Sequence, residues 1–557
     1  MNRDYAKCSG DVNYWFGYDL GYDKTNIQSC GSIGSYAAQQ FNGNITGTVW
    51  KSKGDNEIRK FDYSYDVVNR LTAADYNQYT SGSFNKNAGL DFSLNGMSYD
   101  ANGNILTMNQ KGWKLGGSVT TDSLLYGYIA NSNRLSYVHD RKNDSTSYLG
   151  DFKEYTNNTS QDYSYEGNGS ITKDANKKID TVIYNHLNLP QEIHVAVLPE
   201  MSEGSKTISY TYDASGNKLK KVVKDTLAST NYIITTTTYI NGFVYESKEF
   251  GTEPSTAAYT EKLMFIPTEE GRARMKEDSS AIAYDYMIKD HLGNVRMVLT
   301  EETRTDSYPA ATMETANEAI EEQFYTNLDE TRVDPPNGYP SISGNAKVAK
   351  VNGNDPNDQS VRIGPAIILK VMAGDKFNLT VNSWWKSSAP RLPGPSNILD
   401  DLLGMVSSNV GNVNGGHPTV YELHGSTELS NSVTGFLSSQ SGYDGARPKS
   451  FINWLLLDER FNYVSSSSGF EQVGADEVYS THSFTDMPVA KSGYLYIFVS
   501  NATPDIDVFF DNLQVTHIRG PLVQDQAYSP WGLELKGLSS SALGFGNTQN
   551  QKQKYNG

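Results

Sequence analysis

Residues 210–219, Tyr-Thr-Tyr-Asp-Ala-Ser-Gly-Asn-Lys-Leu, contain the pattern that decides the fold of this chain. The two tyrosines are two residues apart, so their rings lie on one face of a strand. The following Gly-Asn pair supplies the positive φ that a tight hairpin requires. These residues therefore predict a β-hairpin.

The pattern recurs through the first half of the chain, at residues 61–71, 97–105, 126–135 and 163–171, with a weaker copy at 184–189. The key tyrosines are separated by 34, 29, 37 and 47 residues, so the hairpin persists while the insertions vary. They are Tyr65, Tyr99, Tyr128, Tyr165 and Tyr212. A single hairpin is unstable in water, so we expect neighbouring hairpins to pair into a long strip.

An acidic residue follows each tyrosine in most copies: Asp66, Asp100, Glu166 and Asp213. Paired carboxylates can hydrolyse glycosidic bonds, but that chemistry needs one pair at a set separation. Because these acids recur with the hairpin, we interpret them as acceptors for backbone N–H groups of the turns.

The repeated unit resembles the YD repeat of RHS proteins. Residues 284–296, Tyr-Asp-Tyr-Met-Ile-Lys-Asp-His-Leu-Gly-Asn-Val-Arg, are similar to the RHS-associated core motif, whose specific part begins at Asp290. Segments 40–50 and 263–272 resemble the Bacteroidetes-type branch, and the resemblance covers most of residues 40–300. It implies a spiralling β-hairpin shell with structural motif residues, namely Tyr65, Asp66, Tyr99, Asp100, Tyr212, Asp213, Asp290, His291, Gly293, Asn294 and Arg296.

Within the core motif, Asp290 and His291 can also be read as a catalytic pair, since a carboxylate can orient an imidazole. The flanking residues supply no nucleophile. We favour a structural role, with Asp290 and Asn294 bonding turn amides and Arg296 pairing locally.

A second domain interrupts the core. In RHS proteins a Tyr-x-Pro-aromatic-Gly segment soon follows the core motif, but here Tyr528-Ser-Pro-Trp-Gly comes some 230 residues after Arg296. We expect an all-β fold with repeats over 1–300 including the motif at 290–296, a connector at 301–317, an inserted jelly-roll sandwich at 318–518, and the continued core at 519–557. Short helices are expected at 311–323 and 398–406.

Residues 509–515, Phe-Phe-Asp-Asn-Leu-Gln-Val, resemble the final strand of galactose-binding-like jelly rolls. That resemblance implies a possible structural Ca²⁺ at Asp511, with Glu322 as a partner. Trp384 and Trp385 are adjacent and point to opposite faces of a strand, so only one is expected in the core. The other is either covered by a loop or helix, or is a platform that stacks on a glycan. We expect no other cofactor.

The charge excludes some partners. The chain has 47 basic and 64 acidic side chains, a net charge of −17, which disfavours nucleic acid. It has no apolar stretch of membrane-spanning length, and its start has no signal-peptide pattern. Cys8 and Cys30 either pair or stay free.

The resemblance implies a non-catalytic scaffold within a longer protein that is secreted or lies at the cell surface. Shells of this family enclose or deliver a C-terminal toxin in competition between bacteria, and such an effector would be a partner outside this chain. The alternative is a carbohydrate-binding or adhesion module, with the sandwich binding cell-surface glycans on a stalk of repeats. An enzyme that cleaves itself is disfavoured, because the Asp-Pro-x-x-Gly-Arg segment of such members is absent.

Overall fold

The computed structural model describes residues 14–28, 32–144, 149–155, 157–196, 205–226, 231–251, 257–276, 281–342, 344–353, 362–387, 397–411, 413 and 417–547. Cys8 and Cys30 lie outside these residues. Strands dominate, and nearly all pair antiparallel with their neighbours, so the predicted all-β class is confirmed.

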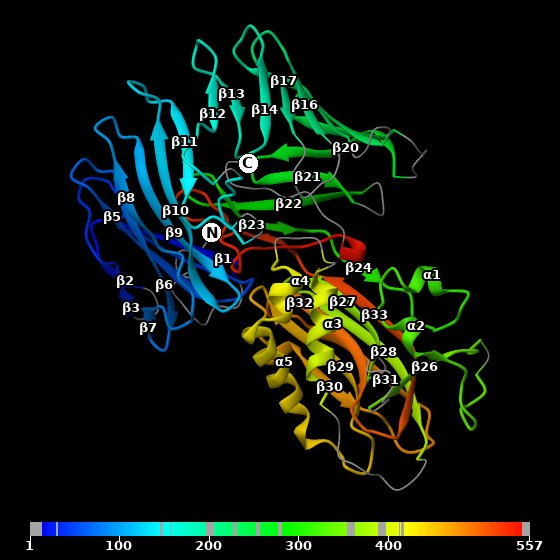
Figure 1. The fold of residues 1–557 in the computed structure, drawn as a ribbon. Coiled ribbons are helices and arrows are strands. Elements are labelled where there is room, and N and C mark those ends of the chain that lie inside the picture. The colour runs from blue at the N-terminus through cyan, green and yellow to red at the C-terminus, as the bar shows by residue number, and fades with distance from the viewer. Residues whose placement is uncertain are drawn as a thin grey trace.

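The first sheet contains the early repeats, drawn in blue and cyan in Figure 1. Its neighbouring strands follow chain order, except that a separate hairpin intervenes after the first strand and one short strand pairs at the side. The strands are β1 (Phe16–Gly21), β4 (Gly47–Ser52), β5 (Ile58–Tyr65), β6 (Leu71–Thr80), β7 (Ser83–Asn85), β8 (Leu94–Tyr99), β9 (Ile105–Lys114), β10 (Gly117–Tyr128) and β11 (Leu135–Asp140). The separate hairpin is β2 (Asn26–Gln28) with β3 (Ser32–Ser35).

The second sheet continues the strip and has 14 strands. The first twelve are consecutive: β12 (Tyr163–Tyr165), β13 (Ile171–Asp174), β14 (Ile179–Tyr184), β15 (Pro190–Val195), β16 (Ser205–Tyr212), β17 (Lys218–Thr226), β18 (Tyr232–Ile240), β19 (Phe243–Phe250), β20 (Tyr259–Thr268), β21 (Gly271–Met275), β22 (Ile282–Lys289) and β23 (Val295–Thr300). The last two come from the end of the chain: β34 (Leu522–Asp525) and β35 (Ser540–Ser541). The strip is therefore completed by residues that follow the insert.

One turn geometry joins most repeat hairpins. In the 210–219 copy, the Asp213 N–H donates to the Asn217 carbonyl and the Gly216 N–H donates to the Asp213 carbonyl. Gly216 has φ +86°, whereas the two residues before it have negative φ. A β-turn followed by one left-handed residue is a three-residue hairpin loop with a bulge, so one residue with positive φ is enough.

The turn acid stabilises this loop with two backbone bonds. The Asp213 carboxylate accepts from Ser215 N at 2.8 Å and from Asn217 N at 2.9 Å. Within the strip, the same bonds to the second and fourth residues after the acid or amide occur in the described turns that begin at Asp66, Asp100, Asn185 and Asp290. These bonds hold the turn because they satisfy amides that the ladder leaves unpaired.

The repeat tyrosines connect each hairpin to the one before it. Each hydroxyl donates to the backbone carbonyl of the residue that follows the preceding turn, at distances of 2.6 to 3.0 Å. The pairs are Tyr65 to Ile45, Tyr99 to Leu71, Tyr128 to Ile105, Tyr165 to Leu135, Tyr184 to Ile171 and Tyr212 to Pro190. This tyrosine ladder explains why tyrosine, and not phenylalanine, recurs at these positions.

The insert is a two-layer sandwich, drawn in green, yellow and orange below the strip in Figure 1. One sheet contains β24 (Arg304–Ser307), β25 (Arg332–Val333), β26 (Val348–Asn352), β28 (Lys376–Trp385), β31 (Ser480–Pro488) and β33 (Asp507–Arg519). The other contains β27 (Ile363–Val371), β29 (Ser450–Asp458), β30 (Gly469–Gln472) and β32 (Gly493–Asn501). The neighbours run β26-β33-β28-β31 and β27-β32-β29-β30, which is the strand order of a jelly roll.

The start of the insert differs from the prediction. Residues 301–317 were expected to connect the domains, but β24 pairs with β33, and Ala311 bridges to Leu513. The expected helix at 311–323 is reduced to α1 (Glu318–Glu321), since the preceding backbone takes part in that bridge. A second short helix, α2 (Leu328–Thr331), follows it.

Helices cover one face of the second sandwich sheet. The helix expected at 398–406 is present and longer, as α3 (Leu399–Gly411), and it packs with α4 (Val420–His424) and α5 (Thr427–Ser439). Sequence patterns did not predict α4 or α5, although each begins with a capping hydroxyl, that of Thr419 and that of Ser426.

We expect Tyr128→Phe to lower the free energy of unfolding by about 1 kcal/mol, because it leaves the Ile105 carbonyl without its hydroxyl donor. The measurement is urea unfolding of the purified chain. Tyr284→Phe is the control, since that ring is 44% exposed and lies outside the ladder. Equal midpoints for Tyr128→Phe and the unsubstituted chain would show that the ladder bond adds no stability.

Candidate functional site: the aromatic clamp on Arg296

The side chain of Arg296 lies at the place where the two ends of the strip meet. It projects from β23, is buried, and its Nε donates to the Gln526 carbonyl at 2.9 Å. Its guanidinium carbon lies 5.4 to 5.9 Å from the centroids of four aromatic rings. The rings are those of Phe16, Tyr18, Trp50 and Tyr528. We call these four rings and Arg296 the aromatic clamp.

The clamp joins three segments that are far apart in the sequence. Two rings come from β1, one from β4 and one from the segment after β34, while Arg296 is the last residue of the core motif. A guanidinium is weakly hydrated and can stack on ring faces, so it tolerates this burial better than an ammonium does. The partner expected for Arg296 is local, and Asp290 does approach it, at 3.8 Å from Nη1 to Oδ2. Four rings therefore surround the guanidinium of Arg296, against this one carboxylate.

The core-motif turn positions His291 against the clamp. Asp290 accepts from the backbone N–H groups of Leu292 and Asn294, each at 3.0 Å, and from Asn294 Nδ2 at 3.1 Å. Gly293 has φ +85°, which glycine adopts without strain. The carboxylate of Asp290 is thereby engaged by its own turn.

His291 contacts Tyr18, with its Nδ1 3.3 Å from the hydroxyl and the two rings stacked at 5.9 Å. Burial lowers the pKa of His291; Asp290 opposes this shift and Arg296 adds to it. Burial raises the pKa of Tyr18 well above its usual value, so its hydroxyl keeps its proton. A protonated phenol beside a neutral imidazole forms a hydrogen bond and is a poor nucleophile.

A cleft of about 200 Å³ opens beside the clamp, and its lining includes rings of β4 and β5 together with His291 and Pro530. The remaining motif residues are not gathered there, except Tyr65. Tyr99 and Tyr212 belong to the ladder, and Asp66, Asp100 and Asp213 lie in separate turns along the strip. The arrangement therefore distributes the motif carboxylates and forms no shared acidic centre.

The sandwich buries both tryptophans that the sequence singled out. Trp384 is 1% exposed and packs with Val348 and Phe509 outside the sandwich core, where Tyr339 covers it edge-on. Trp385 is 3% exposed, belongs to the sandwich core, and donates from Nε1 to the Gly474 carbonyl at 2.9 Å. Of the two alternatives for the outer tryptophan, the structure therefore shows the covered ring, and a glycan cannot stack on it because stacking needs an exposed ring face.

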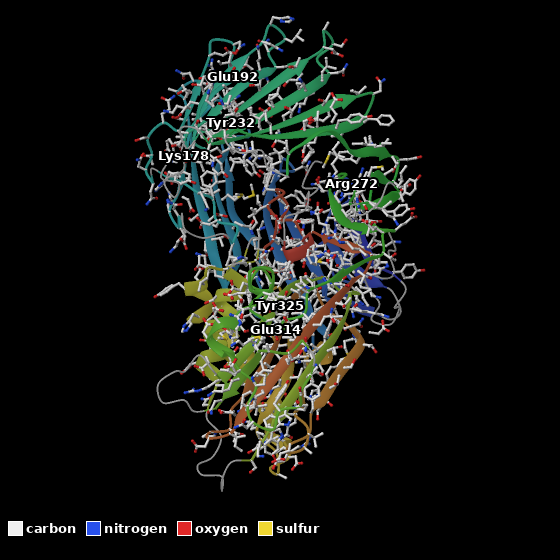
Figure 2. All side chains as sticks on the ribbon, turned by 90° about the vertical axis from the view of Figure 1, so that its right-hand side faces the viewer. Lys178, Glu192, Tyr232, Arg272, Glu314 and Tyr325 are labelled. Atoms are coloured by element: carbon white, nitrogen blue, oxygen red, sulfur yellow. The ribbon has the colours of Figure 1, made fainter. Side chains whose placement is uncertain are left out.

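Asp511 lies buried on β33. The acids whose charges act on it are Glu314 and Glu321, and not the predicted Glu322. Burial raises the pKa of Asp511 to about 7, and the charges of Glu314 and Glu321 add to the shift. Glu322, the expected partner, is exposed and faces Glu318 and Asp329. On the short helix α1 the adjacent Glu321 is the acid that points inward, and it is 1% exposed. Figure 2 labels Glu314 and Tyr325, both on the sandwich.

One carboxylate oxygen of Asp511 is available to a hard cation. Its Oδ1 is buried and has no hydrogen-bond partner in the described residues, and its Oδ2 accepts from Asn345 Nδ2. Carboxylate and amide oxygens are the ligands that Ca²⁺ prefers.

Comparisons with known proteins leave the family open. No family model matches the chain, and no curated protein matches it. Among solved structures, the crystal structure of TcdB2-TccC3-Cdc42 aligns with 49% of this chain and 14% of that one, at 11% identity and a TM-score of 0.30. An exo-β-1,3-galactanase from Phanerochaete chrysosporium with β-1,3-galactotriose aligns with 90% of this chain and 93% of its own, at 7% identity and a TM-score of 0.13. These scores carry no argument about fold or function.

None of the helices in the described part of the chain combines the length and apolar character needed to cross a membrane.

We expect Arg296→Lys to lower the free energy of unfolding by about 1.5 to 3 kcal/mol, because an ammonium loses the bond to Gln526 and stacks less well on the rings. Thermal and urea unfolding measure this change. The exposed Arg141 provides a matched control as Arg141→Lys. A loss no larger than that of the control would mean that the charge alone holds the junction.

Proposed function

We propose that this chain is a non-catalytic structural shell of RHS type, part of an exported or cell-surface protein that encloses or delivers a C-terminal effector. The observation that carries the proposal is the tyrosine ladder, in which one hydroxyl per repeat bonds the backbone of the previous hairpin. A repeat whose sequence signature is used for joining hairpins is a building element. The resemblance of residues 284–296 to the RHS-associated core supplies the family.

The clamp supports a scaffold role as well. The guanidinium of Arg296 is engaged by rings, and His291, the motif residue capable of acid–base chemistry, is engaged by the Tyr18 hydroxyl. Asp290, which would orient a catalytic imidazole, is engaged by turn amides. These contacts favour holding the strip over transforming a substrate.

The carbohydrate-binding alternative loses its main candidates, because both tryptophans are buried. Glycan binding by the sandwich would need another surface, and no further observation in the described residues favours one.

The delivery role predicts the surroundings of the gene. Sequencing the genomic DNA on both sides should reveal more Tyr-Asp repeats upstream, and an Asp-Pro-x-x-Gly-Arg segment with a variable domain downstream. Limited proteolysis of the complete product should then leave that variable domain protected while the shell is folded. Stop codons and unrelated genes on both sides would contradict delivery, and a variable domain that is cut as fast as an isolated one would contradict enclosure.

We also propose that the sandwich holds one structural Ca²⁺ at Asp511, with Glu314 and Glu321 as the neighbouring acids. Calcium is expected to raise the melting temperature of the unsubstituted chain more than that of Asp511→Asn, because binding to the folded state stabilises it. Asp486→Asn, an exposed change on β31, is the control. Equal calcium shifts in Asp511→Asn and the unsubstituted chain would show that Asp511 is not a ligand.

A further inference from the structure

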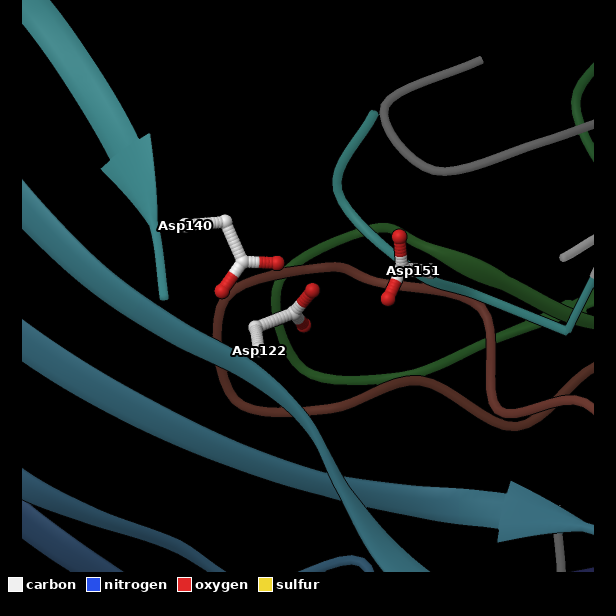
Figure 3. Close-up of side chains that lie close together, drawn as sticks. All are labelled: Asp122, Asp140 and Asp151. Atoms are coloured by element: carbon white, nitrogen blue, oxygen red, sulfur yellow. The ribbon is translucent and has the colours of Figure 1, made fainter. Parts of the chain in front are cut away.

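Three carboxylates converge where the first sheet passes to the second. Asp122 lies on β10, Asp140 ends β11, and Asp151 lies in the loop that leads to β12. Figure 3 shows their side chains directed toward one another. One carboxylate oxygen from each lies within 4.8 Å of the other two. We call these three residues the aspartate triad.

The deepest member of the triad has an unused oxygen. Asp140 is 0% exposed; its Oδ1 accepts from Ser123 N at 2.8 Å and Lys142 N at 2.9 Å. Its Oδ2 is buried and has no hydrogen-bond partner in the described residues. A fully buried carboxylate oxygen without a donor is costly unless something positive binds it.

The loop residue shows the same arrangement. Asp151 accepts at Oδ2 from Asp144 N at 2.9 Å, whereas its Oδ1 is buried without a partner among the described residues. Asp122 is 3% exposed and accepts at Oδ1 from Phe152 N at 2.7 Å. Backbone N–H groups thus fix each carboxylate, and two of them keep an oxygen free.

The triad has little compensating positive charge. Lys114 is the cation whose charge acts on Asp122 and Asp151, but its Nζ bonds the Asp144 carboxylate at 2.5 Å. Burial raises the pKa of Asp122 to about 6 and that of Asp151 to about 7, and the neighbouring aspartates add to both shifts. Like carboxylates at this separation repel each other unless a proton or a cation lies between them.

We propose that the aspartate triad binds a divalent cation, with Ca²⁺ preferred. The available donors are all oxygens, which suits a hard cation and disfavours zinc or copper. Ca²⁺ accepts a flexible set of six to eight oxygens, so that carbonyls and waters can complete the three carboxylates. Mg²⁺ demands a near-octahedral arrangement and gives up its water reluctantly.

The bound cation would link the last strands of the first sheet to the loop that leads into the second sheet. The tyrosine ladder crosses this place only through Tyr165, whose hydroxyl reaches Leu135 at 2.8 Å. A cation held by Asp122, Asp140 and Asp151 ties β10, β11 and the loop that begins the second sheet. It stabilises the passage between the two sheets of the strip, a role separate from the function proposed for the whole chain.

Equilibrium dialysis against radioactive calcium tests the site on the whole chain carrying Asp511→Asn, so that the sandwich does not contribute. We expect about one equivalent to bind, and Asp151→Asn to weaken this binding at least about tenfold. Asp180→Asn, an equal loss of charge on the exposed face of β14, should leave the affinity unchanged. Magnesium in equal concentration should compete poorly.

Asp140→Asn is the second variant and should abolish binding where it folds. Asp151 lies in a loop and is only partly buried, so Asp151→Asn decides the question where Asp140→Asn fails to fold. Absence of calcium binding at millimolar concentration would overturn the proposal, and so would equal affinity in Asp151→Asn and its Asp511→Asn parent.

Discussion

The burial of Arg296 among four aromatic rings is the interaction on which the arrangement of this molecule depends. A strip of hairpins has two ends, and each is a row of unpaired backbone groups that invites association. Here β1 and β4, at one end, supply three of the rings, while β23, near the other, supplies the guanidinium. A buried guanidinium that lost these rings would be left without partners, which is costly. The contact therefore holds the two ends of the strip together.

Between those ends, hydrogen bonds between adjacent hairpins hold each hairpin in place. Each tyrosine hydroxyl reaches the hairpin before it, and asparagines of adjacent turns also bond, as Asn102 does with Asn133 at 3.1 Å. A single bond of this kind contributes only about 0.5 to 1.5 kcal/mol, but the register of each hairpin is set by its predecessor. Insertions of different length are tolerated because they lie outside the bonded tyrosine, turn and carbonyl.

The fold was largely predictable from the sequence, because its signals are local. Tyrosines two residues apart, an acid and a glycine three residues later specify one hairpin, and the jelly-roll strands have long apolar runs. The site was less predictable, because its contacts span the chain. Phe16 and Tyr18 show the same alternation as the repeats and are followed by Asp19, which marks them as a repeat strand. Nothing local connects them to Arg296, some 280 residues away.

One alternative left open and one wrong prediction have the same origin at smaller scale. The alternation rule places Trp384 and Trp385 on opposite faces, but it does not decide whether the outer ring is covered, which depends on the loop that brings Tyr339 over it. Glu321 and Glu322 are adjacent on a helix of four residues, too short for periodicity to say which one faces inward. In both cases the deciding neighbour is distant in sequence.

The position of the insert explains how a sandwich can interrupt the strip without breaking it. Leu299 pairs with Leu522, so the chain leaves and re-enters the strip at adjacent strands. Domains with neighbouring ends can be inserted into a parent fold at little cost.

The insert also packs tightly against the rest of the molecule. Its strands β27, β29 and β32 are buried on both faces. On β27, for example, Ile367 faces the sandwich core and Ile368 faces the helices and the strip. A sheet that is apolar on both faces needs two covers, and the second cover consists of the helices of the insert together with the strip. The insert and the strip therefore stabilise each other, and a shell that lost the sandwich would expose the apolar surface beside the clamp.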